Sequence, residues 1–215
     1  GAVYLSPGAT VKMRESTFKS NKAVEGGGIY VSRNSKFYSF GCTFNLNRAS
    51  DNGGAISATM SPSCIIDNCL FVKNTATRGG ALEMLNLKDA KVSHSTFMSN
   101  SAAATGGALS TRGKSDIVLE SLELLENSGQ EGAAIAVMDS SKIALLDSTF
   151  ARNSAAKGGG IYSQDNADCT IKNSSFTKNH ARSFFAPDAD VEGSASWCGS
   201  SPGNELVTPV YKWFY

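Results

Sequence analysis

The sequence predicts an all-β fold: a right-handed parallel β-helix, a solenoid of about seven coils, with 26–27 residues and three short strands in each coil. Two observations lead to this prediction. A Phe-x-x-Asn motif returns at a fixed period, and six of its seven copies are followed by a Gly-rich step into a short apolar run. A period of this size is typical of solenoids, whose repeats bury their apolar faces against one another. Right-handed winding is expected because parallel crossovers nearly always take that hand.

The repeated motif begins with Phe in six copies and with Leu in one. Successive copies start 26, 27, 26, 27, 26 and 26 residues apart, at Phe18, Phe44, Phe71, Phe97, Leu124, Phe150 and Phe176. Asparagine follows three residues later in every copy, at Asn21, Asn47, Asn74, Asn100, Asn127, Asn153 and Asn179. If like residues of successive coils lie over one another, the seven asparagines form a ladder in which each amide bonds to its copies. Asparagine also tolerates the left-handed backbone conformation.

Three strands are predicted in each coil. The residues seven and five before the Phe position are mostly apolar, as at Ile117 and Leu119, and this alternation indicates a strand with one face inward. A turn-prone pair precedes a second strand that carries the Phe itself, and the Gly-Gly step opens a third strand, such as the one with Leu82 and Met84. The residue two after each Asn is always Ala or Gly, which we attribute to a corner packed against identical corners.

A leucine-rich repeat has a similar period, but the sequence disfavours it. That fold needs a Leu-rich consensus and a helical or 3₁₀ return segment. The repeats here are rich in Gly, Ser, Thr and Asn, which disfavour helix. The β-helix therefore accounts better for the pattern.

The repeated residues resemble those of a known family. Phe44-x-x-Asn47 with Gly53-Gly54-Ala55-Ile56, and Phe97-x-x-Asn100 with Gly106-Gly107-Ala108-Leu109, are similar to the FxxN and GGA(I/L) repeats of the chlamydial polymorphic membrane proteins. The resemblance runs from Gly1 to about Ala181, with departures at Leu124 and at Gly132-Ala133. It implies a surface-exposed or secreted segment that adheres or scaffolds, without enzyme chemistry.

The repeat also divides the chain. Residues 1–192 are predicted to form the β-helix, with Asp190-Val191 as a last, weakened copy of the third strand. Residues 193–215 are predicted to be a C-terminal cap or a docking tail. The chain begins with Gly1-Ala2-Val3-Tyr4, which matches the second half of a Gly-Gly-Ala-Ile step, and we therefore expect it to be a piece of a longer polypeptide.

Cysteine placement gives a candidate disulfide. Cys42 and Cys69 both lie two residues before a Phe, so they occupy the same site on consecutive coils and are candidates for a bridge. Cys64 and Cys169 are four coils apart and are expected to be core thiols, with Cys198 either reaching Cys169 or remaining free. No Cys-x-x-Cys pair suggests zinc, and no metal or cofactor is predicted.

Composition and charge argue against several classes of function. The formal net charge is +1, which disfavours nucleic-acid binding, and no apolar stretch is long enough to span a bilayer. We expect an extracellular or cell-surface location. The expected partners are other protein chains or further domains of the same protein, with glycans as a further candidate. Tyr4, Tyr30 and Tyr162 are expected to point outward without forming a receptor patch.

The rival prediction is a polysaccharide lyase or hydrolase of the β-helix type. Such chemistry needs outward carboxylates and basic residues on neighbouring coils. His94 and Asp147 occupy equivalent corners two coils apart, too far for a direct proton relay, and Arg152 with Lys178 makes at most a small basic spot. The favoured function is therefore a non-enzymatic scaffold or adhesive segment of a larger protein or filament.

Overall fold

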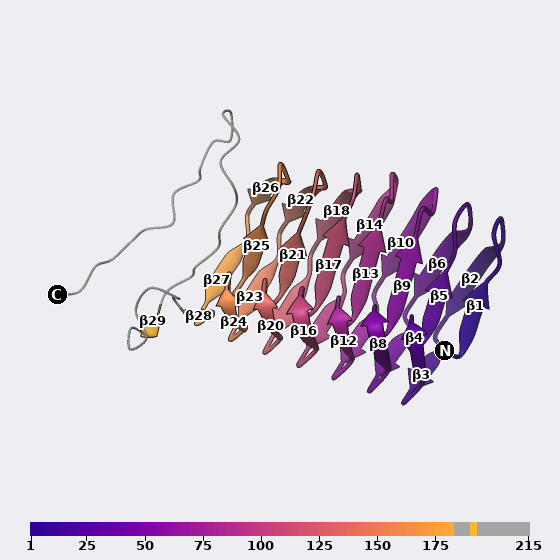
Figure 1. Ribbon diagram of the computed structural model, residues 1–215, viewed down its shortest axis with the longest axis horizontal. Coiled ribbons are helices and arrows are strands. Elements are labelled where there is room, and N and C mark those ends of the chain that lie inside the picture. Colours follow the sequence, from indigo (N-terminus) through magenta and orange to yellow (C-terminus); the bar gives the residue numbers. More distant parts are fainter. Residues whose placement is uncertain (183–189, 193–215) are drawn as a thin grey trace.

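The computed structural model describes residues 1–182 and 190–192. Within these ranges the chain forms strands β1 to β29, stacked as seven coils in a row (Figure 1). Strands of successive coils pair in parallel, so the predicted all-β solenoid is confirmed. This described part of the chain contains no helix with the length and apolarity needed to cross a membrane.

Each coil contains four strands, so the prediction of three strands per coil is wrong. The strands belong to four sheets, here called A to D, which follow one another in chain order. The missed strand is the one in sheet D, directly after the ladder asparagine. Its inward side chains are only Ala or Gly, so no large apolar residue marks it in the sequence. Its pairing relies on backbone hydrogen bonds between coils, which any residue except Pro can donate.

The strands of the first two sheets have the following bounds. Sheet A contains β1 (Val3–Leu5), β5 (Ile29–Val31), β9 (Ile56–Thr59), β13 (Leu82–Leu85), β17 (Leu109–Arg112), β21 (Ile135–Val137) and β25 (Ile161–Ser163). Sheet B contains β2 (Thr10–Arg14), β6 (Lys36–Phe40), β10 (Ser63–Asp67), β14 (Ala90–Ser93), β18 (Asp116–Glu120), β22 (Lys142–Leu146) and β26 (Asp168–Lys172).

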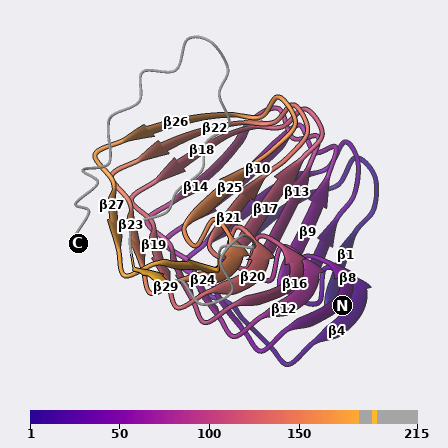
Figure 2. The ribbon, with the colours of Figure 1, turned by 60° about the vertical axis from the view of Figure 1, so that its left-hand side comes forward.

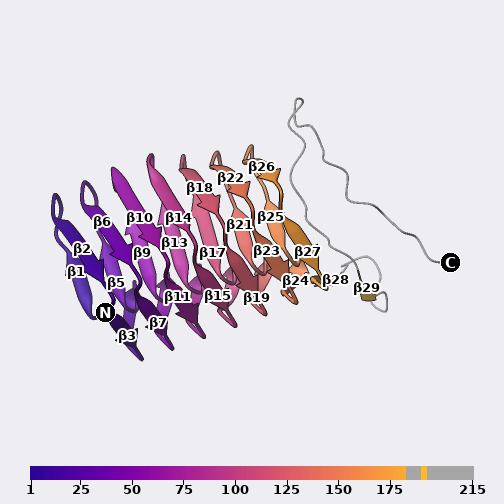
Figure 3. The same cartoon turned by 180° about the vertical axis from the view of Figure 1, so that it is seen from behind.

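The other two sheets complete each coil. Sheet C contains β3 (Thr17–Lys19), β7 (Thr43–Asn45), β11 (Leu70–Val72), β15 (Thr96–Met98), β19 (Glu123–Leu125), β23 (Thr149–Ala151) and β27 (Ser175–Thr177). Sheet D contains β4 (Lys22–Glu25), β8 (Arg48–Asn52), β12 (Thr75–Arg78), β16 (Ser101–Thr105), β20 (Ser128–Glu131), β24 (Ser154–Lys157), β28 (His180–Arg182) and β29 (Asp190–Glu192). Figure 2 shows the coils closer to end on. Figure 3 shows the molecule from behind, with the strands of sheet C labelled.

Strand β29 pairs antiparallel with β28, with Val191 opposite Ala181. It is therefore not a last copy of the sheet A strand, which corrects the prediction for Asp190-Val191. The segment reverses direction and extends sheet D instead of adding another coil. The predicted cap or docking tail, residues 193–215, lies outside the described residues.

The difference between 26-residue and 27-residue coils is absorbed in sheet D. The two longer intervals belong to the coils that contain β8 and β16, and these two strands have five residues where β4, β12, β20 and β24 have four. The pairing register shifts at β8 and β16, as expected for a β-bulge. Sheets B and C stay in register, so the aromatic column is not displaced.

The small residue after each Asn has a different explanation from the one predicted. It lies on the inward side of sheet D, not at a corner, and faces the backbone of the Gly-Gly step. A Cβ added to Gly129, the one glycine at this site, would lie 3.3 Å from the backbone nitrogen of Gly107. From the other side, a Cβ added to Gly80 would lie 2.6 Å from the carbonyl oxygen of Ser101 in sheet D. The close approach of these two backbones leaves no space for a long side chain.

Candidate functional site

The seven asparagines lie over one another at the corner between sheets C and D. The Nδ2 group of Asn74 donates to Oδ1 of Asn100 at 3.0 Å and to the carbonyl oxygen of Phe44 at 2.9 Å. The backbone N–H of Asn74 donates to the same Oδ1 at 3.0 Å. The Asn-to-Asn contacts recur at every step of the series Asn21, Asn47, Asn74, Asn100, Asn127, Asn153 and Asn179.

The asparagines themselves do not take the left-handed conformation. A positive φ occurs one residue earlier, as at Leu46 (56°) and Arg152 (55°), and again three residues before the Phe position, as at Asn68 (51°) and His94 (46°). The tolerance of asparagine for that conformation is therefore not what places it in the ladder. The turn precedes Asn, which leaves its side chain directed along the stack, where both ends of the amide find partners.

The aromatic residues stack beside this ladder. Ring centroids lie 5.0, 4.9 and 4.6 Å apart in the series Phe18, Phe44, Phe71 and Phe97. Leu124 interrupts the column, and Phe150 then stacks on Phe176 at 4.5 Å. Rings at this separation add attraction beyond their area burial.

The predicted disulfide between Cys42 and Cys69 is absent, and both are free thiols. The two residues belong to a second ladder, two positions before the Phe site, in which serine is the usual member. Ser148 Oγ donates to the carbonyl oxygen of Leu146 at 2.7 Å and accepts the backbone N–H of Leu122 at 3.0 Å. Cys69 Sγ makes the same contacts, to the carbonyl oxygen of Asp67 at 3.3 Å and to the N–H of Cys42 at 3.4 Å. Each sulfur thus faces backbone groups instead of the other sulfur.

Replacing Cys69 with serine is therefore expected to change the free energy of unfolding by less than about 1 kcal/mol, because serine makes the same contacts elsewhere in the ladder. Peptide mapping without reductant should recover Cys42 and Cys69 as separate thiols, since neither is oxidised. Burial raises the pKa of the Cys64 thiol to about 12, so this thiol should resist alkylation until the protein unfolds. A disulfide-linked peptide that contains Cys42 and Cys69 would contradict the assignment.

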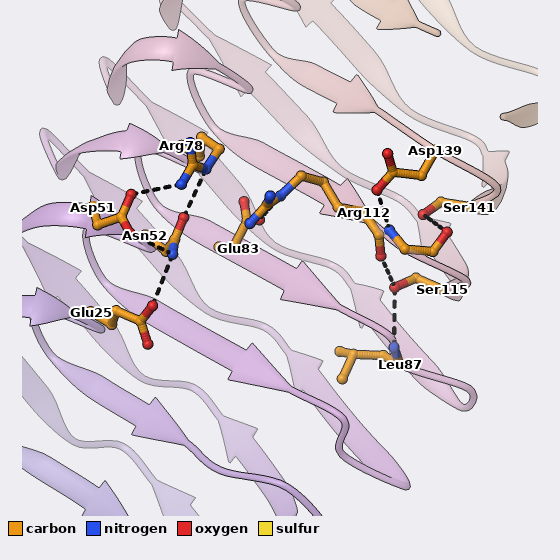
Figure 4. Close-up of polar contacts among 11 residues, drawn as sticks. Glu25, Asp51, Asn52, Arg78, Glu83, Leu87, Arg112, Ser115, Asp139 and Ser141 are labelled. Atoms are coloured by element: carbon orange, nitrogen blue, oxygen red, sulfur yellow. Dashed lines mark hydrogen bonds and ion pairs between the residues drawn. The ribbon is translucent and has the colours of Figure 1, made fainter. Parts of the chain in front are cut away.

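The outer face of sheet A and its borders carry a further set of polar contacts, drawn in Figure 4. The outward positions are in register from β1 to β25, with Ser57, Glu83 and Ser110 in the middle of the row. These three are at most 2% exposed although they point away from the core. The last residue of each sheet D strand from β4 to β24 lies along the same row. The glycine that follows it, such as Gly158, has a positive φ and turns the chain back toward sheet A. Lys157, for example, lies 5.7 Å from the ring centroid of Tyr162.

One part of this row is a chain of hydrogen bonds across three coils. Asn52 Nδ2 donates to Glu25 Oε1 at 3.0 Å, and Arg78 Nε donates to Asn52 Oδ1 at 3.0 Å. Arg78 Nη2 also pairs with Asp51 Oδ1 at 2.8 Å. The charge of Arg78 is thus neutralised by Asp51 within the protein, while Glu25 is held by the amide of Asn52.

The second part is the pair of buried Glu83 and partly exposed Arg112, which sequence reasoning missed. Arg112 Nε lies 2.6 Å from Glu83 Oε1, while Glu83 Oε2 is buried without a hydrogen-bond partner. Burial raises the pKa of Glu83 above its ordinary value, and the charge of Arg112 opposes that rise. The only signal in the sequence is that Glu83 stands where other coils have Tyr, Ser or Ala.

This raised pKa predicts how a Glu83→Gln variant responds to pH. An acid whose pKa is higher in the folded state stabilises the fold below its unfolded pKa and loses that contribution as pH rises through the folded pKa. Glutamine does not ionise, so it makes no pH-dependent contribution to stability. The melting temperature of the variant relative to the natural protein is therefore expected to increase as pH rises from about 4 upward. A difference that is constant over this range in thermal melts would contradict the prediction.

His94 and Arg152, which were weighed for the rival enzyme prediction, are each paired with an acidic side chain. His94 Nδ1 lies 2.8 Å from Asp67 Oδ1, and this hydrogen bond lowers the pKa of Asp67. Arg152 pairs with Glu126 of the preceding coil, at 3.1 Å. No group of three or more His, Cys, Asp or Glu side chains assembles in residues 1–182 and 190–192.

The outward tyrosines lie at the two ends of the row. Tyr4 stacks on Tyr30 with ring centroids 5.5 Å apart, while Tyr162 is on the seventh coil and bonds through its hydroxyl to Gln164 Oε1 at 2.7 Å. Tyr4 is 65% exposed, so the first two coils present an aromatic surface that the middle of the sheet lacks.

Comparison with known families agrees with this architecture. The family described as "Right handed beta helix region" matches residues 28–202, and the "Chlamydia polymorphic membrane protein (Chlamydia_PMP) repeat" matches residues 15–32. Searches among curated proteins and among solved structures returned no significant match. The second match covers Phe18, Asn21 and the first Gly-Gly step, the residues on which the resemblance rests. With most of its length matched by the first of these families, the chain belongs to the right-handed β-helix family and carries a polymorphic membrane protein repeat.

Proposed function

We propose that this chain is a non-enzymatic repeat domain of an extracellular or cell-surface protein, acting as a rigid scaffold or an adhesive segment. The observation that carries the proposal is the use of side chains in the Asn ladder. Its amides bond from coil to coil along the whole described stack, so the repeated polar residues are occupied in building the column. A column tied together in this way keeps its outer faces in fixed relative positions.

The charges of the sheet A row support the same proposal. Arg78 pairs with Asp51, Arg112 with Glu83, and Lys157 with Glu131. A polysaccharide-cleaving site needs carboxylates and basic groups directed at a substrate. Here each of these cations already has a carboxylate partner within the protein. The polymorphic membrane protein repeat at residues 15–32 further supports a surface protein.

Surface location and the two roles are tested separately. Protease treatment of intact cells should remove an epitope in this domain if the protein is exposed, and protection until lysis would overturn the proposed location. Beads coated with the domain should bind cells saturably if it is adhesive. Concentration-dependent growth in sedimentation should appear if it is a scaffold. Failure of both assays would refute the proposed roles.

A polysaccharide-active enzyme is the second candidate, and Glu83 is the observation that favours it. A buried carboxyl with a raised pKa beside an arginine is typical of a general acid or base. Incubation with polygalacturonate or alginate should then release new reducing ends, or new ultraviolet absorbance for a lyase. Glu83→Gln should abolish the reaction while a Glu126→Gln control retains it. Absence of product with both polymers would leave the non-enzymatic proposal standing.

A further inference from the structure

Positive charge is concentrated on the first two coils. Residues 1–60 contain seven Lys or Arg and three Asp or Glu, an excess of four positive charges. Residues 61–182 contain twelve of each and are balanced. The near-neutral charge of the whole chain therefore hides a positively charged end of the β-helix.

Three of these cations lie together on the outer face of sheet B. Lys12 and Arg14 are exposed on β2, and Lys36 is exposed on β6. Neither strand contains an acidic residue. The register places Tyr38 beside Lys12 and Phe40 beside Arg14. We call Lys12, Arg14, Lys36, Tyr38 and Phe40 the β2–β6 patch.

Two of the three patch cations, Lys12 and Arg14, contact rings instead of acids. Lys12 Nζ lies 5.6 Å from the ring centroid of Tyr38, and Arg14 Cζ lies 4.9 Å from that of Phe40. Among the described residues, none of the ion pairs involves Lys12, Arg14 or Lys36, whereas Arg78, Lys91, Arg112, Arg152 and Lys157 all have acidic partners. The rings hold the cations across the sheet and leave their charges unneutralised, which reduces the entropy lost when an anion binds.

The acids that border the patch do not cancel it. Glu15 follows β2 at a corner, and Asp67 lies beside Phe40 on β10. Asp67 already accepts hydrogen bonds from Ser93 and His94, so its charge is directed away from Arg14. The patch thus presents an excess of positive charge to solvent.

We propose that the β2–β6 patch binds a sulfated polysaccharide, an inference that rests on the extracellular location proposed above. Lys12 and Arg14 are two residues apart, about 7 Å along the strand, and Lys36 lies on the next coil, so a polyanion lying on the sheet meets all three. Guanidinium and ammonium groups both form charge-assisted hydrogen bonds with such oxyanions.

Two other polyanions fit the patch less well. Single-stranded nucleic acid binds by stacking bases on aromatic faces, but Lys12 and Arg14 already cover Tyr38 and Phe40. Anionic lipids are concentrated in the cytoplasmic leaflet, which an extracellular domain does not meet. Both are kept as arms of the test.

The experiment measures binding of the purified chain to immobilised heparin over a range of salt concentrations. With three ionic contacts, affinity should fall about forty-fold between 50 and 200 mM salt, using the coefficient measured for double-stranded DNA. A Lys12→Gln, Arg14→Gln, Lys36→Gln variant should lose at least about ten-fold in affinity and most of this salt dependence. Circular dichroism of each variant establishes that the fold is intact.

A matched control removes the same charge elsewhere. Lys73→Gln, Lys142→Gln and Lys178→Gln change exposed residues on other coils and should leave heparin affinity within about two-fold of the natural chain. Desulfated heparin should bind at least ten times more weakly. Equal loss in both triple variants, no heparin binding, or equal or tighter binding to single-stranded DNA or to phosphatidylserine vesicles would overturn the assignment.

The two proposals fail in different ways. If the domain is protected from protease on intact cells, the extracellular location is refuted whatever heparin does. If it is exposed but the patch variant binds heparin like the natural chain, only the patch assignment is refuted.

Discussion

Replacing Asn100 with alanine is expected to lower the free energy of unfolding by about 3–5 kcal/mol, because a buried amide with four hydrogen bonds is lost. Asn100 Nδ2 donates to the carbonyl oxygen of Phe71 at 3.0 Å and to Asn127 Oδ1 at 3.1 Å. Its Oδ1 accepts both the backbone N–H and the amide of Asn74, each at 3.0 Å. Alanine removes all four contacts. Asn127 Oδ1 keeps the backbone N–H of residue 100, and Asn74 Nδ2 keeps the carbonyl oxygen of Phe44. The backbone N–H of Asn74 loses its acceptor, and the carbonyl oxygen of Phe71 loses this donor.

The control is the same substitution at the end of the ladder. Asn21 is only partly buried, and its side chain makes a single ladder bond, to Asn47 Oδ1 at 2.9 Å. Asn21→Ala should therefore cost about 1 kcal/mol. Urea unfolding of both variants measures the difference. Equal losses at the two positions would mean that burial of the amide network does not stabilise the column.

The periodic residues were enough to predict the stacking of coils and its register. Phe44, Phe71 and Phe97 recur at the repeat interval and pair directly, because in-register stacking is the arrangement that buries all of them at once. The same reasoning did not reveal sheet D. Its inward residues, such as Ala76 and Ala102, are small because they face the glycine backbone, and small residues carry no strand signal.

The sheet A row was harder to predict because its contacts depend on how the chain turns between the sheet D strand and the sheet A strand that follows it. The residue before each Gly-Gly step is Glu25, Asn52, Arg78, Thr105, Glu131 or Lys157. Glu25, Asn52 and Arg78 occupy this position in three successive repeats, so their chain of hydrogen bonds is predictable from the sequence. Glu83 and Arg112 are 29 residues apart, which is not a repeat interval, so no table of equivalent positions aligns them.

The cysteine prediction failed because sequence equivalence fixes which coils are neighbours but not the direction of a side chain. Cys42 and Cys69 do occupy equivalent sites, with Cys42 accepting the backbone N–H of Leu70 through its carbonyl oxygen at 2.9 Å. Their sulfurs are held by hydrogen bonds to backbone groups, as serine hydroxyls are at Ser95 and Ser148. Other repeats have serine at this position, and this indicates a side chain that bonds to backbone groups.

Replacing Gly79 with alanine is the second substitution expected to have a large effect, a loss of about 3–5 kcal/mol in the free energy of unfolding. Gly79 has a φ of +59°, and a Cβ there would lie 2.1 Å from the carbonyl oxygen of Leu82. The left-handed conformation and the overlap with backbone both contribute, and backbone cannot move aside as a flexible side chain does. The first residue of the step is glycine in each of the six copies at Gly26, Gly53, Gly79, Gly106, Gly132 and Gly158.

Gly41 separates the two contributions, because it has nearly the same φ, +62°, but open surroundings. A Cβ at Gly41 would be no closer than 3.6 Å to any other atom, the Cγ of Glu15, and other coils place Asn68 or His94 at this corner. Gly41→Ala is therefore expected to cost about 1 kcal/mol, since the strain of the left-handed conformation is partly offset by reduced freedom of the unfolded chain. Chemical denaturation of the two variants compares them directly. If both variants lose the same stability, backbone strain alone sets the requirement for glycine. The close approach of the Leu82 carbonyl would then not explain why the first residue of the step is glycine in all six copies.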